Sequence, residues 1–212
     1  MSAPISFVDY FTQVQAAPGW DAILASFARF VAPPSGARIL DVGCGPGSLV
    51  RRFADEGFEV VGVDVDPAMI DRARELAADM PNVEFRVGEV TRLPYLPDSF
   101  DVVVATNVIF FLDDPLAGVR GMSAVCEPDG IVAMLNPSEK MSVAAAEALA
   151  DAQGLAEMNR VSLVNWAGVA ERNRRMSEAE VTMLFTAAGL TQIETVTKIG
   201  PGLARFVRGV KL

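Results

Sequence analysis

Short apolar runs alternate with amphipathic stretches along most of the chain. Apolar runs bounded by Gly, Pro or Asp predict buried strands, and apolar residues spaced three and four apart predict helices. The pattern predicts strands at residues 38–42, 59–64, 83–87, 100–105 and 131–135. Helices are predicted before and between these strands, over 18–32, 48–56, 67–79 and 116–126. Strands that alternate with helices indicate a mostly parallel sheet that is covered by helices on both faces.

The last third of the chain has a different rhythm. Residues 139–172 show no strand pattern, only an Ala-rich helical composition with a break near Gly154. A helix is predicted to begin after Ser177, which has Glu180 three residues on, and to be closed by Gly189. Two β-like runs, 190–196 and 203–210, are close enough to form a hairpin.

These runs bring the expected number of strands to seven. The predicted fold class is therefore α/β: a Rossmann-like, doubly wound, mostly parallel seven-stranded sheet with one antiparallel edge strand. The segment 139–175 is predicted to be a helical insertion between the fifth strand and the final two.

The amino-acid composition excludes several classes of protein. The chain has 212 residues, 51% of them hydrophobic, so a sizeable core needs no disulfide or metal. Cys44 and Cys126 cannot make a disulfide framework, and no apolar run is long enough to span a membrane. Residues 1–4 lack the basic flank and apolar stretch of a signal peptide, so we expect a cytoplasmic protein.

The chain contains no histidine, which excludes Ser-His-Asp triads and most zinc sites, and we expect no metal. The net charge of −9 disfavours a nucleic-acid partner, because phosphate binding needs a basic face. The charge is also uneven: residues 1–138 hold 19 acidic and nine basic residues, whereas residues 139–212 hold eight and nine.

A glycine-rich loop carries the main chemical signal. Asp41 begins the pattern Asp-x-Gly-x-Gly-x-Gly, which follows a predicted strand, contains Gly43 and Gly45, and opens a helix. Glycines there permit a tight turn and close approach of the backbone to a ligand. Asp64 ends the next strand, where a carboxylate can accept hydrogen bonds from a ribose diol, while Asp66 fits the role of helix N-cap better. The pair favours a nucleoside ligand.

The spacing of residues in the loop distinguishes a dinucleotide ligand from other nucleoside ligands. A dinucleotide fingerprint needs a small apolar residue where this chain has Ser48. Asp41, directly before the glycines, offers nothing to a pyrophosphate but would attract a cationic ligand.

These residues resemble the class I S-adenosylmethionine-dependent methyltransferases, in particular the small-molecule branch that includes ubiquinone and menaquinone enzymes. Residues 39–47, which read ILDVGCGPG, resemble the first motif of the family, and the end of the second strand resembles the next. Residues 88–101 resemble the third region, and Glu-Pro-Asp-Gly at 127–130 stands where the family usually has Lys-Pro-Gly-Gly. The likeness is strong over 36–136 and moderate over 177–212.

The resemblance implies S-adenosylmethionine as cofactor, S-adenosylhomocysteine as product and a small-molecule acceptor. It implies one domain with N-terminal helices (1–35), a cofactor-binding core (36–137), a helical insertion over the acceptor (138–176) and a terminal helix and hairpin (177–212). By position, Asp41 would hold the methionine ammonium and Asp64 the ribose. The remaining implied contacts are the backbone at Gly43 and Gly45, Val65, Met69, Glu89 and Val90 around the adenine, and Thr106 or Asn107 at the methionine end.

The acceptor side is predicted less closely. Many relatives carry a histidine after strand four, whereas this chain has none, and no catalytic residue can be assigned. Tyr10, Phe11 and Trp20 could face the sulfonium or simply pack a helix. Six residues of the insertion could form an apolar acceptor pocket or simply belong to the core: Met141, Leu155, Met158, Leu163, Val164 and Trp166. Three arginines could bind an acidic group of the acceptor or simply form a solvated face: Arg172, Arg174 and Arg175.

Three rival functions remain at this point. One is an aminopropyl-transfer enzyme on the same fold. A nicotinamide-dependent oxidoreductase uses a related fold, although Ser48 and Asp41 fit it poorly. A non-catalytic protein that binds the same nucleoside is also compatible with the missing histidine.

Overall fold

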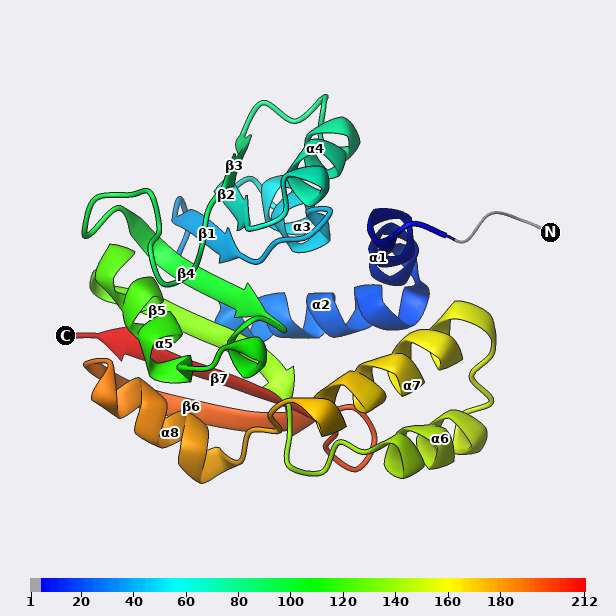
Figure 1. Ribbon diagram of the computed structural model, residues 1–212. Coiled ribbons are helices and arrows are strands. Elements are labelled where there is room, and N and C mark those ends of the chain that lie inside the picture. Colours follow the sequence, from blue (N-terminus) through cyan, green and yellow to red (C-terminus); the bar gives the residue numbers. More distant parts are fainter. Residues whose placement is uncertain (1–4) are drawn as a thin grey trace.

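A seven-stranded sheet forms the centre of the molecule, and helices pack on both of its faces (Figure 1). The computed structural model describes residues 5–212. Its strands are β1 (Arg38–Val42), β2 (Glu59–Asp64), β3 (Val83–Val87), β4 (Phe100–Thr106), β5 (Cys126–Pro137), β6 (Leu190–Lys198) and β7 (Ala204–Lys211). Its helices are α1 (Phe7–Ala16), α2 (Pro18–Val31), α3 (Ser48–Asp55), α4 (Pro67–Leu76), the short 3₁₀ helix η1 (Ile109–Phe111), α5 (Pro115–Val125), α6 (Val143–Ala152), α7 (Glu157–Arg172) and α8 (Glu178–Ala187).

The strand order is β3-β2-β1-β4-β5-β7-β6. β1 to β5 pair in parallel, and β7 pairs antiparallel with both β5 and the edge strand β6. The predicted hairpin and the predicted mostly parallel sheet with antiparallel pairing at one edge are confirmed. The strand that runs against the other six is β7, one position in from that edge. The order reverses between β1 and β4, and open α/β sheets bind ligands beyond the carboxyl ends of the strands at such a point.

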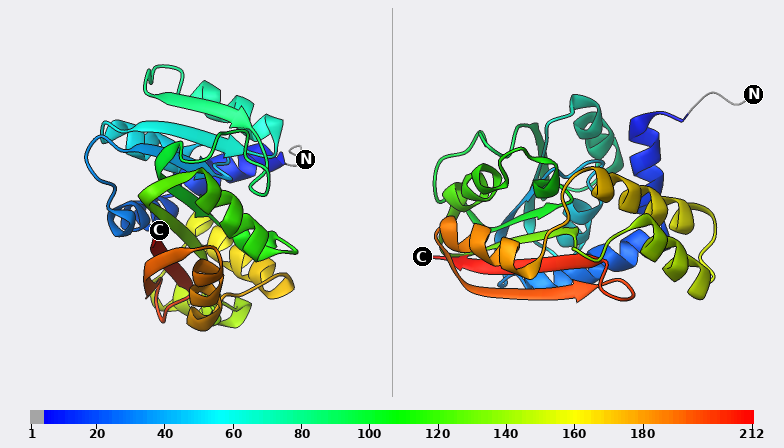
Figure 2. Two further views of the ribbon diagram at one scale, coloured as in Figure 1. Left: turned by 90° about the vertical axis from the view of Figure 1, so that its left-hand side faces the viewer. Right: turned by 60° about the horizontal axis from the view of Figure 1, so that its bottom comes forward.

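The two faces of the sheet carry separate apolar clusters. Helices α2, α3 and α4 contribute Phe27, Phe53 and Ile70 to one cluster. Helices α5 and α8 contribute residues such as Met122 and Phe185 to the other. The two further views in Figure 2 show the sheet between these helix layers, with α6 and α7 beyond one end of it.

Several predicted boundaries need correction. Helix α4 ends at Leu76 rather than residue 79, because residues 77–80 form a turn in which the Met80 N–H donates to the Ala77 carbonyl at 3.0 Å. Strand β5 is longer than the predicted 131–135 and begins at Cys126, which pairs with Phe100. The Pro-Asp-Gly segment at 128–130 is a bulge inside this strand, since the register shifts beside it.

Local signals at helix ends are confirmed. Asp66 caps α4, and its side chain accepts from the Ala68 N–H at 2.9 Å. Ser177 and Glu180 form the predicted capping box of α8, while Gly189 follows that helix with a φ of 81°. The break near Gly154 separates α6 from α7.

Helices α6 and α7 pack against each other beyond the sheet, and Arg205 of β7 fastens the segment that contains them. Its guanidinium is 4% exposed and donates to both carboxylate oxygens of Glu139 at 3.1 Å. Its Nε donates to the Met176 carbonyl at 3.3 Å. Glu139 stands before α6 and Met176 after α7, so one buried cation holds both ends of the segment.

No helix within residues 5–212 has the length and apolar character needed to cross a bilayer. Cys44 and Cys126 are both buried and unbridged. Residues 1–4, on which the expectation of no signal peptide depends, lie outside the described part of the chain.

Candidate functional site

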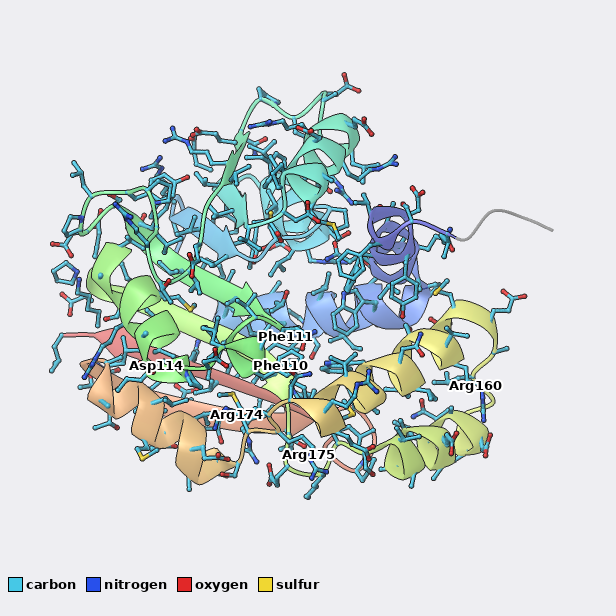
Figure 3. The ribbon with its side chains drawn as sticks, in the orientation of Figure 1. Phe110, Phe111, Asp114, Arg160, Arg174 and Arg175 are labelled. Carbon is cyan, nitrogen blue, oxygen red and sulfur yellow. The ribbon has the colours of Figure 1, made fainter. Side chains whose placement is uncertain are left out.

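A cavity of about 1070 Å³ opens at the carboxyl ends of β1, β2 and β4. The sheet edge forms one side of it, and residues of α1, α2 and α7 form the other. Phe110 and Phe111, just beyond the end of β4, also line it and are labelled in Figure 3. The cavity therefore lies at the point where the strand order reverses, as the fold predicts for a ligand site.

Eight of the nine residues predicted to bind the cofactor line this cavity. They are Gly43, Gly45, Asp64, Val65, Met69, Glu89, Val90 and Thr106. The ninth, Asp41, is buried in β1 just before the glycine loop. Asn107, the alternative to Thr106, lines the cavity as well.

The glycine loop is fixed by its neighbours as well as by its own turn. The N–H groups of Gly43 and Cys44 donate to the Val63 carbonyl at 2.6 and 3.0 Å. Gly43 has a φ of 72°, and a Cβ added there would lie 2.1 Å from Val108 Cγ2. A side chain at this position would therefore collide with the segment after β4, which explains the glycine.

Asp64 connects β2 to the glycine loop. One carboxylate oxygen accepts from the Gly45 N–H at 2.8 Å, and the other accepts from the Asp66 N–H at 3.0 Å. Burial raises the pKa of Asp64, while these backbone donors oppose the rise. Asp66 caps the helix, so Asp64 is not the N-cap, and its carboxylate, held by these two backbone donors, lines the cavity.

Asp41 is the most unusual polar group of the site. Its side chain is 1% exposed, and neither carboxylate oxygen has a hydrogen-bond partner among residues 5–212. Burial, with a smaller contribution from the charge of Asp64, raises the pKa of Asp41 to about 8. A buried carboxylate without partners is costly, so this position suits a ligand that brings a positive charge.

The residues predicted to surround an adenine form a shallow apolar patch. Met69 and Val90 are buried, whereas Val65 is 70% exposed. Glu89 is exposed, and one of its oxygens accepts from the Thr91 hydroxyl at 2.8 Å. A flat ring could pack on this apolar surface with a carboxylate at its margin.

The segment after β4 contributes a second buried polar atom without a partner. Asn107 has a φ of 58°, and its N–H donates to the Leu135 carbonyl at 2.8 Å. Its side-chain oxygen is buried and has no hydrogen-bond partner in the described residues. It lines the cavity together with Thr106, so a ligand donor is its natural partner.

Helix α1 covers the glycine loop. The hydrophobic pattern of the sequence did not predict this helix. Gln15 of α1 accepts from the Ser48 N–H at 3.1 Å. Asp9 pairs with Arg72 of α4 at 3.1 Å, and the Tyr10 hydroxyl accepts from Asn165 Nδ2 of α7 at 3.0 Å. Each contact joins residues far apart in sequence, so no local signal could have identified Gln15 as part of the site.

The half of the cavity formed by helices is predominantly apolar, and only some of the residues proposed for the acceptor line it. Tyr10, Phe11 and Trp20 all line the cavity. From the insertion, Leu155, Leu163 and Trp166 line it, whereas Met141, Met158 and Val164 do not. Arg172 lines it, whereas Arg174 and Arg175 do not.

Residues 40–134 match the methyltransferase domain family. A ubiquinone biosynthesis O-methyltransferase of Xanthomonas campestris is 33% identical over 133 residues, which are 62% of this chain and 54% of that protein. The chain thus spans about half the length of this curated relative.

Solved structures share the fold at low sequence identity. The protein in complex with the Haloferax volcanii Trm112 methyltransferase activator has a TM-score of 0.73 at 21% identity, over 99% of both chains. Phosphoethanolamine N-methyltransferase 2 of Haemonchus contortus, solved with S-adenosyl-L-methionine, has a TM-score of 0.71 at 16% identity, over 96% of this chain and 56% of that one.

Proposed function

We propose that the chain is a class I S-adenosylmethionine-dependent methyltransferase, as its similarity to the methyltransferase domain family and to a ubiquinone biosynthesis O-methyltransferase supports, and that it transfers the methyl group of S-adenosylmethionine to an apolar small molecule. The observation that carries the proposal is the unpartnered, buried carboxylate of Asp41 beside a ligand-sized cavity. The methionine part of the cofactor bears an ammonium group, which is the kind of partner that this carboxylate lacks.

The residues of the sheet edge fit the rest of the cofactor. Asp64 would bind the ribose hydroxyls, and the backbone at Gly43 and Gly45 would lie along the amino-acid part. Val65 and Met69 would pack against the adenine, with Glu89 and the Val90 amide at its polar edge. Thr106 would contact the methionine end.

Bound S-adenosylmethionine supplies a methyl group already activated by a positively charged sulfur. The protein then has to align the acceptor and exclude water, which accounts for much of the rate enhancement in such reactions. Helices α1 and α7 meet through Tyr10 and Asn165, and apolar residues of both helices line the cavity, where they would help to exclude water from a bound acceptor. We assign no residue of the cavity as a general base. The wall formed by α1, α2 and α7 is mostly apolar and would suit an apolar acceptor.

The rival oxidoreductase reading is disfavoured by the start of α3. A dinucleotide pyrophosphate needs the free N–H groups at that helix terminus. Here the Ser48 N–H is taken by Gln15, and the Gly45 N–H is taken by Asp64.

Turnover of an acceptor panel tests the proposal. The panel begins with phenols and hydroquinones of increasing apolar size, continues with amines and thiols, and is read as acceptor-dependent formation of S-adenosylhomocysteine. We expect at least one apolar acceptor to raise this rate in the wild type and not in Asp64→Ala. Cofactor binding without turnover on any acceptor would instead support the non-catalytic alternative.

A further inference from the structure

Charge is distributed unequally inside the cavity. The carboxylates that line it, Asp64, Asp66 and Glu89, all belong to the cofactor half at the sheet edge. In the half formed by α1, α2, η1, α6, α7 and the β6–β7 turn, the lining residues include no Asp, Glu or Lys, and the chain has no histidine. The charged residue that lines that half is Arg172, which is exposed.

Arg172 differs from the other arginines of its region. Arg160, at the opposite end of α7, pairs with Asp151, and Arg175 donates to the Met141 carbonyl at 2.9 Å (Figure 3). Arg174 lies outside the cavity, on the segment that joins α7 to α8. Arg172 has neither a salt bridge nor a hydrogen bond to any residue in the range 5–212, although it lines the cavity.

The position of Arg172 follows from the helical face that it shares. Ser162, Asn165, Val169 and Arg172 are spaced three or four apart on α7, and all line the cavity. Its Nη1 lies 3.5 Å from the place where a Cβ of Gly168 would be, so the side chain folds back along its own helix. Val169, three residues earlier on the same face, is partly buried against the apolar cluster on the α5–α8 side of the sheet and also lines the cavity.

We infer that the acceptor is an apolar molecule with one anionic group, which Arg172 binds, and this inference rests on the proposed function. The apolar wall accommodates the body of such a molecule, and the free guanidinium supplies the opposite charge. Charge-assisted hydrogen bonds from a guanidinium are among the stronger polar contacts.

Two fluorescent probes test the inference without turnover. The first, 1-anilinonaphthalene-8-sulfonate, has an aromatic body and one sulfonate; the second, N-phenyl-1-naphthylamine, is the same body without the sulfonate. Both of the chain's tryptophans, Trp20 and Trp166, line the cavity, so energy transfer from them reports a bound probe. Dissociation constants are measured for the wild type, Arg172→Gln, Arg172→Lys and Arg174→Gln.

We expect Arg172→Gln to weaken binding of the sulfonate probe about tenfold, as the loss of one charge-assisted hydrogen bond predicts, and to leave binding of the neutral probe unchanged. Arg172→Lys should restore part of the affinity, because it keeps the charge. Arg174→Gln should bind both probes like the wild type. An unchanged affinity for the sulfonate in Arg172→Gln, or an equal loss for both probes, would overturn the inference.

Calorimetry with S-adenosylhomocysteine on the same four proteins separates this inference from the proposed function. Failure of the wild type to bind S-adenosylhomocysteine would count against the methyltransferase proposal, whatever the probes show. Normal cofactor binding with no probe dependence on Arg172 would count against the anionic acceptor alone.

Discussion

The two halves of the cavity are built in different ways. The cofactor half is formed by strand ends and a glycine loop, and its carboxylate Asp64 is held by backbone N–H groups such as that of Gly45 at 2.8 Å. The acceptor half is formed by helices from the N-terminus and the insertion, and its wall is mostly apolar side chains such as Trp20 and Trp166. The first half suits recognition of one fixed ligand, whereas the second recognises shape and apolar area.

Among residues of the cofactor half, substitution of Asp64 is expected to have the largest effect on cofactor binding. Asp64→Ala should weaken binding of S-adenosylhomocysteine roughly a thousandfold, because two hydrogen bonds to a carboxylate are lost and the Gly45 N–H loses its acceptor. Isothermal titration calorimetry measures this change. The matched control is Asp71→Ala, which removes an exposed carboxylate of α4 that pairs with Arg74; an equal loss in both variants would contradict a specific role for Asp64.

The next effect is a pH dependence that belongs to Asp41. Its pKa in the free protein is about 8, against an ordinary value of 3.8, so the carboxyl is protonated at neutral pH. An ammonium ligand needs the ionised form, so binding below pH 8 releases a proton. Affinity for S-adenosylhomocysteine should rise by about fiftyfold from about pH 6 to about pH 8 and then level off.

The same raised pKa affects stability with the opposite sign. The folded free protein binds this proton more tightly than the unfolded chain, so the free energy of unfolding should fall as pH rises from about 4 to about 8. Chemical denaturation across this range measures the change. In Asp41→Asn, cofactor affinity and the free energy of unfolding should both depend less on pH. If cofactor affinity in that variant kept the wild-type pH dependence, a group other than Asp41 would be the one that releases the proton.

The cofactor half was predictable because its signals are local. Asp41 lies near the end of β1, Gly43 to Gly47 follow that strand directly, and Asp64 ends β2; both strand ends must meet at one sheet edge in a parallel fold. The sequence could not identify Gln15 or separate Arg172 from Arg174 and Arg175, because those outcomes depend on how distant helices pack. Similarly, Met141 and Leu163 have the same apolar character, but Leu163 lines the cavity and Met141 does not.

A smaller effect tests whether α1 contributes to the cofactor half. Gln15→Ala removes the acceptor of the Ser48 N–H. Affinity for S-adenosylhomocysteine should fall about fivefold, the value of one neutral hydrogen bond. Gln13→Ala, which changes an exposed residue of the same helix, is the control, and a normal affinity in both variants would show that α1 does not support cofactor binding.

The smallest effect on the cofactor is expected from the opposite wall. Trp166 packs against Trp20 with ring centroids 5.3 Å apart. Trp166→Ala should lower the free energy of unfolding by about 2–3 kcal/mol through lost packing, yet change cofactor affinity less than about twofold. Denaturant titration and calorimetry measure the two quantities, and a large loss of cofactor affinity in a folded variant would show that the halves are not separate.

Parallel calorimetric titration of the wild type with S-adenosylhomocysteine and with NAD decides between a methyltransferase and an oxidoreductase. We expect saturable binding of S-adenosylhomocysteine at one site per chain and no binding of NAD, because the Ser48 and Gly45 N–H groups are already engaged. Binding of NAD, or no binding of S-adenosylhomocysteine by the folded protein, would contradict the methyltransferase proposal.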